Sequence, residues 1–331
     1  MARFPNLLDV ANSMAPDGSV SAVAEVMHQT NEIFADTTVV EGNLPQGHKV
    51  TMRAGIPEPT FRKFYGYVQP DKSERVAVTE SVGNLEAYSE IDKDIADLNG
   101  NTAEFRMSES TAHIEGFAQK IARYIFFGDH FANPESWHGL EPRFNDPTAV
   151  NGEQIIDGGG RDADNASIWL IGWGEQSCTL FYPKGSQMGL QVNDKGQQTI
   201  YGTGADVDGR REAYITHFKQ ELGLAVPDWR YISRIANIKR SALTADAATG
   251  ANLPRLMAMA TNRVHNLSGA NYAFYMDRET KEWFELQMAE AVKNSTLTFE
   301  DIGGHRAQMF RGIPIRRVDQ LNADEVAVPF A

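Results

Sequence analysis

Helical periodicity is the strongest pattern along the chain, and it runs over residues 101–126. Asn101 and Glu104 match the pairing that caps a helix N-terminus, and Gly128 suits the C-terminal end. Apolar residues recur at helical spacing between these ends: Phe105, Ile114, Phe117, Ala118, Ile121, Ala122 and Ile125. The sequence therefore predicts one long helix over 101–126, which would span about 35–40 Å.

The segment that follows this helix, residues 125–145, interleaves turn residues with large aromatic side chains. A loop with this much apolar surface has to bury it against something. We therefore expect Phe131 and Trp137 to be structural anchors packed under the helix. The apolar run 167–173 predicts a buried strand. Its two tryptophans, Trp169 and Trp173, are expected to be structural anchors in the core rather than parts of a ligand cage.

Alternation of apolar and polar residues at 48–54 and 74–80 predicts two strands of an extended hairpin over 48–82. A lone two-stranded hairpin is marginal in water, so we expect its basic tip to contact a neighbouring copy of the chain. A solvated turn remains an equal alternative for the tip lysines. The candidate contact residues are Phe61, Arg62, Lys63, Phe64, Tyr65, Lys72 and Arg75.

The rest of the chain mixes shorter strands and helices, which indicates an α+β fold. Residues 1–47 are expected to form an arm whose amphipathic patch, 22–34, needs a partner surface. Two strands, 213–219 and 229–236, could pair with each other. The other expected elements are strands at 271–276 and 309–319, helices at 252–265 and 279–292, and turns at 183–185 and 193–196.

Composition narrows the function classes. The 331 residues are 42% hydrophobic and 23% charged, as in ordinary globular proteins. A net charge of −13 argues against tight nucleic-acid binding. The single cysteine, Cys178, excludes an intrachain disulfide and a cysteine metal cage. No apolar run approaches a membrane span and the start lacks a signal-peptide core, so we expect a cytosolic chain and no membrane partner.

The search for catalytic motifs is mostly negative, so we expect no enzymatic activity and no catalytic, cofactor or metal site. Asp162, Asp164 and Asn165 could hold a hard cation, but a solvated loop is favoured because the calcium-loop pattern is missing. The alternative is an enzyme or small-molecule-binding protein with a site near Asp129, His130 and His138. No nucleophile lies beside these residues in the sequence, which favours a structural role for them.

Four segments, taken in order, resemble the major capsid proteins of tailed bacteriophages with the Hong Kong 97-type fold. The resemblance is strongest to the branch found in some short-tailed phages, the Bordetella phage type. The segments are Phe126–Arg143, Ser167–Gly174 with its continuation Phe181–Leu190, Asp228–Asn237 and Phe310–Asp319. Each segment alone is weak evidence, but four in the same order are fairly specific.

The resemblance implies a fold with an N-terminal arm, an extended hairpin loop, a peripheral domain with a long spine helix, and an axial domain. The expected ranges are 1–47 for the arm, 48–82 for the extended loop, 83–147 for the peripheral domain with spine helix 101–126, 148–300 for the axial domain and further peripheral strands, and 301–331 for a C-terminal strand that returns to the core.

The function implied is that of a viral structural protein. Copies would self-assemble into pentamers and hexamers of an icosahedral shell enclosing double-stranded DNA, without sequence-specific DNA binding. The expected partners are further copies of the chain, a portal protein and a scaffolding protein, with a cement protein left open. The expected location is the virion capsid, assembled in the cytoplasm of the bacterial host.

Overall fold

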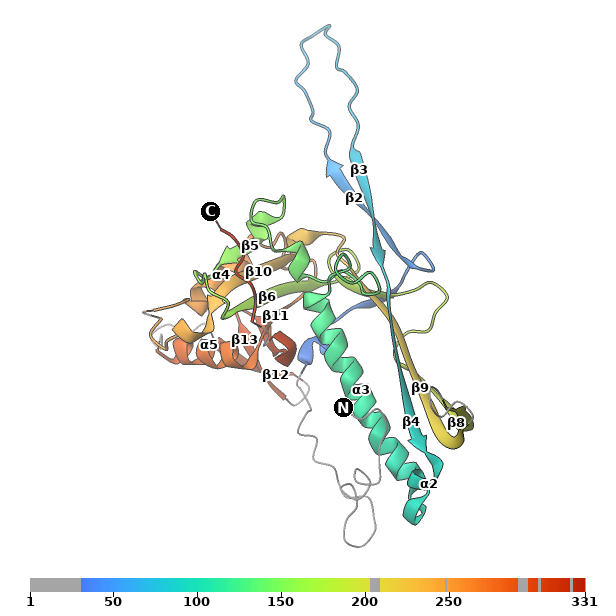
Figure 1. The fold of residues 1–331 in the computed structure, drawn as a ribbon. Helices are drawn as coiled ribbons and strands as arrows, with labels where there is room; N and C mark the ends of the chain where they lie inside the picture. The colour runs from blue at the N-terminus through green and yellow to red at the C-terminus, as the bar shows by residue number, and fades with distance from the viewer. Residues whose placement is uncertain are drawn as a thin grey trace. The chain divides into compact units, whose positions relative to one another are not determined.

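The computed structural model describes residues 31–202, 209–247, 249–290, 297–302, 305–321 and 324–330, and it mixes helices with sheets (Figure 1). The described residues fall into two compact units. Unit 1 is built from Asn84–Ala122 and Gln187–Glu221, and unit 2 from Thr30–Gly83, Arg123–Ser186 and Leu222–Ala331. Both units interleave distant segments, so they do not coincide with the contiguous ranges 83–147 and 148–300 expected above. Most of the amphipathic patch at 22–34 lies outside the described residues.

The long helix is α3 (Thr102–Phe127), within one residue of the range expected from the sequence. Its first part belongs to unit 1, where Phe105 and Phe117 are buried. Ile114, which the helical stripe placed inside, is 46% exposed. The helix is preceded by α2 (Lys93–Ala96), whose N-terminus is capped by the side chain of Asp92.

Three strands accompany α3 in unit 1: β4 (Gly83–Asp92), β8 (Gln191–Tyr201) and most of β9 (Arg210–Ala225). β9 pairs with both β8 and β4. The turn expected at 193–196 is wrong, because β8 continues through this stretch. A register shift between Asp194 and Gly196 accommodates it, with Gly196 at φ 69° and its amide donating to Asp194 Oδ1 at 2.8 Å.

Unit 2 is organised around a seven-stranded sheet of order β12-β13-β14-β11-β6-β10-β5. Its strands are β5 (Ile155–Asp157), β6 (Asn165–Trp173), β10 (Ile232–Lys239), β11 (Asn271–Met276), β12 (Leu297–Ile302), β13 (His305–Phe310) and β14 (Ile313–Arg317). Helices α4 (Leu253–Arg263) and α5 (Arg278–Glu290) pack on it. Both helices, β6 and β11 match the expected ranges to within a few residues.

The predicted pairing of the strands at 213–219 and 229–236 is wrong. β9 and β10 were expected to pair with each other, but they belong to different sheets. The end of β9 pairs with β7 (Thr179–Tyr182), which itself pairs in parallel with β1 (Val39–Glu41), whereas β10 lies between β6 and β5.

The expected C-terminal strand at 309–319 is instead the hairpin of β13 and β14. Arg311 and Gly312 both have positive φ, 53° and 78°, which is the conformation of a tight two-residue hairpin turn. Pro314 lies opposite Met309 in this hairpin and does not prevent β14 from pairing with β11 on its other side.

The expected extended hairpin is present in unit 2 as β2 (Gly47–Gly55) and β3 (Glu74–Ser81). Eight residue pairs join the strands in antiparallel register, from Gly47 opposite Ser81 to Gly55 opposite Glu74. Beyond them, residues 56–73 form a long loop without helix or strand (Figure 1).

Candidate functional site

The loop at the end of the hairpin, residues 56–73, exposes large apolar side chains. Four aromatic rings are almost completely accessible: Phe61 at 108%, Phe64 at 95%, Tyr65 at 101% and Tyr67 at 100%. Ile56 is 83% exposed. We call residues 56–73 the hairpin tip. Large apolar side chains exposed together on one loop mark interaction sites.

Local hydrogen bonds shape the hairpin tip. The amide of Gly66 donates to the Lys63 carbonyl at 3.0 Å, and the turn holds Tyr65 at φ 62°. Nearer the strands, the Asp71 carboxylate accepts the amides of Glu58 at 3.3 Å and Lys72 at 2.7 Å. These bonds lie within the tip, so its contact candidates, which include Arg62 and Arg75, stay a prediction about another molecule.

The base of the hairpin is fixed to the rest of unit 2 by a buried ion pair. Arg143 donates two parallel hydrogen bonds to the Glu80 carboxylate, each 2.7 Å long, and the side chains are 17% and 8% exposed. Arg143 also donates to the carbonyls of Gly139 at 3.0 Å and His138 at 3.1 Å. The hairpin base is therefore joined to the loop that follows α3.

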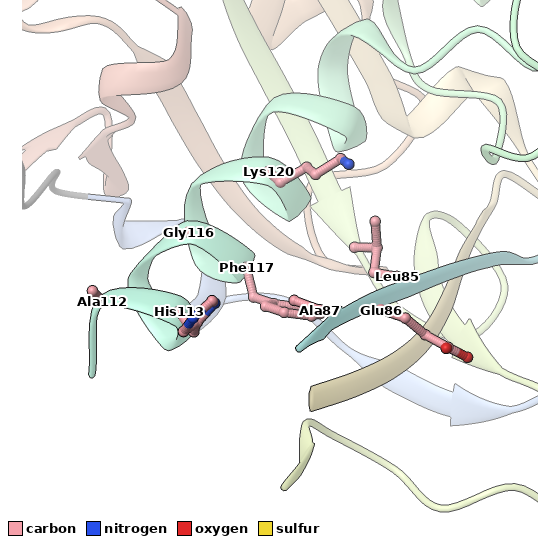
Figure 2. Close-up of a pocket in the computed structure, with 8 residues that line it drawn as sticks. All are labelled: Leu85, Glu86, Ala87, Ala112, His113, Gly116, Phe117 and Lys120. Carbon is pink, nitrogen blue, oxygen red and sulfur yellow. The ribbon is translucent and has the colours of Figure 1, made fainter. Parts of the chain in front are cut away.

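Unit 1 carries an apolar groove of about 320 Å³ between α3 and β4. Figure 2 shows its α3 residues on one side and its β4 residues on the other. The lining residues are Leu85, Glu86, Ala87, Ala112, His113, Gly116, Phe117 and Lys120. The His113 ring stacks on Phe218 with centroids 5.2 Å apart, and burial lowers the pKa of His113.

The residues of the alternative enzymatic site come together but do not form a nucleophile and base pair. Asp129 Oδ1 lies 3.7 Å from His138 Nδ1 and accepts the Phe131 amide at 2.9 Å. His130 Nδ1 lies 2.8 Å from the Ser136 carbonyl. The Ser136 hydroxyl donates to the Asn133 carbonyl at 2.8 Å rather than to an imidazole. Burial, more than any other cause, lowers the pKa of His138. These contacts shape a turn, and nothing here supports the enzyme alternative.

Three of the four expected anchors are buried. Trp137, Trp169 and Trp173 are at most 1% exposed, and Tyr124 contacts the Trp137 ring edge at 5.8 Å between centroids. The prediction for Phe131 is wrong, because its ring is 86% exposed and meets His138 at the surface, with centroids 5.3 Å apart, instead of packing under the helix. The reason is local: Asp129 caps its backbone amide in a turn that leaves the ring outside.

The described residues contain no group of three His, Cys, Asp or Glu side chains that could hold a metal ion. Asp162 instead pairs with Lys239 at 2.5 Å, and Asp164 accepts the Ser241 amide at 3.0 Å. Cys178 is completely buried, which raises the pKa of its thiol. Among the described helices, none is both long and apolar enough to cross a membrane.

Comparison with solved structures relates the chain to bacteriophages. It is similar to a chain in the structure of bacteriophage Epsilon15, with a TM-score of 0.78 and 34% identity, over 99% of this chain and 98% of that one. It also matches the bacteriophage JBD30 capsid, with a TM-score of 0.50 and 10% identity, over 90% of this chain and 93% of that one. The second match concerns the fold alone.

Comparison with families gives the same answer. A search of curated proteins finds no match. The family model for the major capsid protein GP7 matches residues 15–329, which is nearly the whole chain. The α+β fold, the long helix α3 and the extended hairpin agree with the phage capsid resemblance noted from the sequence. The chain therefore belongs to the family of major capsid proteins GP7 and has a structural role in a bacteriophage capsid.

Proposed function

We propose that copies of this chain assemble into pentamers and hexamers of an icosahedral shell around double-stranded DNA, and that the hairpin tip of each copy packs on a neighbour. The observation that carries this proposal is the exposure of four aromatic rings on one loop, Phe61, Phe64, Tyr65 and Tyr67. Family membership supplies the context, because a capsid subunit acts through contacts with its own kind.

The size of the hairpin tip fits a protein interface. Four aromatic side chains can bury about 600–1,000 Å² together, at about 150–250 Å² each. One partner in a standard interface contributes about 800 Å². The tip alone therefore has enough apolar surface for one side of a specific contact.

Charge favours another copy of the chain as the partner. Arg62, Lys63, Lys72 and Arg75 lie in or beside the hairpin tip and outnumber Glu58, Asp71 and Glu74 by one, while the whole chain carries a net charge of −13. A basic tip is attracted to an acidic surface, which speeds encounter and fixes the register of binding. The same negative charge would keep the shell wall from gripping packaged DNA.

The further partners rest on the resemblance to other tailed-phage capsid proteins. Under this proposal the subunit works with a portal protein and a scaffolding protein, and assembly takes place in the bacterial host cytoplasm. We also propose that residues 1–47 act as an arm and that residues within 148–300 form the axial domain. A cement protein is a further partner under the same proposal.

The triple variant Phe61→Ser, Phe64→Ser and Tyr67→Ser tests the role of the hairpin tip. Because these rings contact nothing else in the described chain, the variant should fold normally by circular dichroism. We expect the concentration needed for assembly, measured by size-exclusion chromatography and negative-stain imaging, to rise about 10-fold or more.

The matched control keeps the rings: Phe61→Tyr, Phe64→Tyr and Tyr67→Phe should assemble as the unmodified chain does. Shells formed at unchanged concentration by the serine variant would contradict the proposed role of the tip.

A further inference from the structure

The last described segment of the chain, residues 324–330, lies in a socket on unit 2. Two of its side chains are buried: Glu325 is 6% exposed and Val328 is 3% exposed. Between them Val326 is 86% exposed. The segment is thus held at two anchors three residues apart, and neither anchor belongs to a strand of the seven-stranded sheet.

The first anchor is a carboxylate bound by a buried guanidinium. Arg234, on β10, is 0% exposed and donates from Nη2 to Glu325 Oε2 at 2.7 Å. Its Nε donates to Ser167 Oγ at 3.1 Å and its Nη1 to the Phe144 carbonyl at 2.7 Å. The Ser167 hydroxyl in turn donates to Glu325 Oε2. The guanidinium lies over the Trp169 ring, 5.1 Å from its centroid.

Arg234 requires this carboxylate. A guanidinium stays charged in any protein environment, and a buried charge is costly unless it is paired. The other carboxylate nearby, Glu141, is 3.6 Å away and 30% exposed. Burial, the largest influence, raises the pKa of Glu141, which makes it the poorer counter-charge. Glu325 is therefore the main partner of the buried cation.

The second anchor is a backbone clamp. Asn237 occupies the irregularity where the register of β10 against β6 shifts, and it has φ 59°. Its Nδ2 donates to the Val328 carbonyl at 2.9 Å, and its Oδ1 accepts the Val328 amide at 2.8 Å. The side-chain amide thus makes the two hydrogen bonds that a neighbouring strand would make.

We propose that Ser167, Arg234 and Asn237 form a peptide-recognition site, the C-terminal socket, whose occupant is the chain's own segment 324–330. The socket binds the carboxylate of Glu325 and, three residues later, the backbone of Val328. Its parts come from β6 and β10, which pair with each other through six residue pairs without help from the segment. The sheet therefore positions the backbone of all three socket residues independently of the segment, and we expect the socket to accept the same peptide in trans.

Hydrogen exchange on the full-length chain tests the two anchors. Glu325→Gln leaves the buried Arg234 guanidinium without its counter-charge, so the Val328 amide should exchange about 100-fold faster. Asp324→Asn is the matched control, since Asp324 is the adjacent carboxylate, is 71% exposed and pairs with Arg240 at 3.2 Å. Exchange at Val328 should change less than about 3-fold in this control.

A second variant keeps the test decisive where Glu325→Gln does not fold. Asn237→Gly removes the backbone clamp, retains the ion pair, and suits the positive φ at this position. The Val328 amide should exchange about 10-fold faster in this variant, with the rest of β10 unchanged.

Binding in trans is measured with a labelled peptide of sequence Asp-Glu-Val-Ala-Val-Pro-Phe. The full-length chain carrying Glu325→Gln and Val328→Asp, which disable its own segment, should bind this peptide. The unmodified chain, with its socket occupied, should not. A peptide with Gln in place of Glu should bind at least about 30-fold more weakly.

Three results would overturn the proposal. One is equal exchange at Val328 in the Glu325→Gln and Asp324→Asn chains. Another is unchanged exchange in Asn237→Gly. The third is a folded Glu325→Gln and Val328→Asp chain that does not distinguish the Glu peptide from the Gln peptide.

Discussion

At the scale of single residues, the ion pair between Glu80 and Arg143 attaches the hairpin base to the loop that follows α3. Both hydrogen bonds between them are 2.7 Å long, and the Glu80 side chain is 8% exposed. Breaking a buried ion pair leaves the remaining charge without compensation, which costs far more than breaking an exposed pair. The hairpin base should therefore depend on this pair more than on any exposed pair of unit 2.

We expect Glu80→Gln to lower the free energy of unfolding by about 3 kcal/mol, because Arg143 loses its buried counter-charge. The midpoint of urea denaturation measures the change. Asp162→Asn is the control, since the Lys239–Asp162 side chains are 38% and 62% exposed, and its cost should stay below about 1 kcal/mol. Equal costs for the two substitutions would show that the Glu80–Arg143 pair has no special role.

His113 makes the stability of unit 1 depend on pH. Burial lowers its pKa below the ordinary value of 6.5, so the unfolded chain takes up its proton first as the pH falls. The contribution of His113 is complete above pH 6.5 and is lost as the pH falls below that value. Glu86 lines the same groove and stays ionised in this window, because hydrogen bonds, first from Asn84, lower its pKa.

His113→Phe should therefore make stability less dependent on pH between about 7 and 5, since the ring on Phe218 is kept and the proton is removed. Urea midpoints of both chains across this range measure the difference. Parallel curves for the two chains would exclude His113 as a source of the pH dependence.

The loop after α3 shows why some residue predictions succeed and others fail. Burial of Trp137 follows from the cost of leaving a large ring in water. Phe131 carries a similar ring and is 86% exposed, because a hydrogen bond from its own amide to Asp129 sets the direction of the chain. Such a turn depends on local geometry that composition does not reveal. The roles of Arg143 and Arg234 were also missed, since their partners lie 63 and 91 residues away.

At the scale of elements, close backbone packing determines where α3 ends. A Cβ on Gly128 would lie 2.6 Å from the Tyr124 carbonyl oxygen and 2.7 Å from that of Trp137. A Cβ on Gly139 would lie 2.7 Å from the Gly128 amide nitrogen. Gly128 was expected at the helix end for its conformational freedom, but its lack of a side chain is what the packing requires.

Gly139→Ala should destabilise the chain by about 1–3 kcal/mol, because the added carbon has no room beside Gly128. Gly116→Ala is the opposite case, since a Cβ there meets nothing within 4 Å on the surface of α3. It should stabilise the helix by about 0.5–1 kcal/mol. Thermal denaturation of both variants measures the contrast, and shifts of the same sign would contradict it.

The elements predicted correctly from the sequence are those specified by neighbouring residues. The stripe of α3 and the alternation of β2 and β3 are local patterns. The pairing of β9 with β7 and β4 is not local, because each of these partners is chosen by packing across the fold. The expected turn at 193–196 failed for a related reason: a bulge with its glycine in the left-handed region resembles a turn in sequence.

At the scale of the whole molecule, the proposed function depends on contacts between copies of the chain. The family model and the Epsilon15 similarity both extend over nearly the whole chain. The resemblance named from the sequence is confirmed by them, while the hairpin-tip contacts at Phe61, Lys63 and their neighbours stay a prediction. No pattern in a single chain specifies which surface of another copy they meet.

The central claim is that this chain assembles with itself through such contacts. Negative-stain imaging of the purified full-length chain, after size-exclusion chromatography over a range of salt and protein concentrations, tests it most directly. We predict capsomers, closed shells or tubes within this range of conditions. A protein that stays monomeric or dimeric under every condition and binds a small ligand would contradict it.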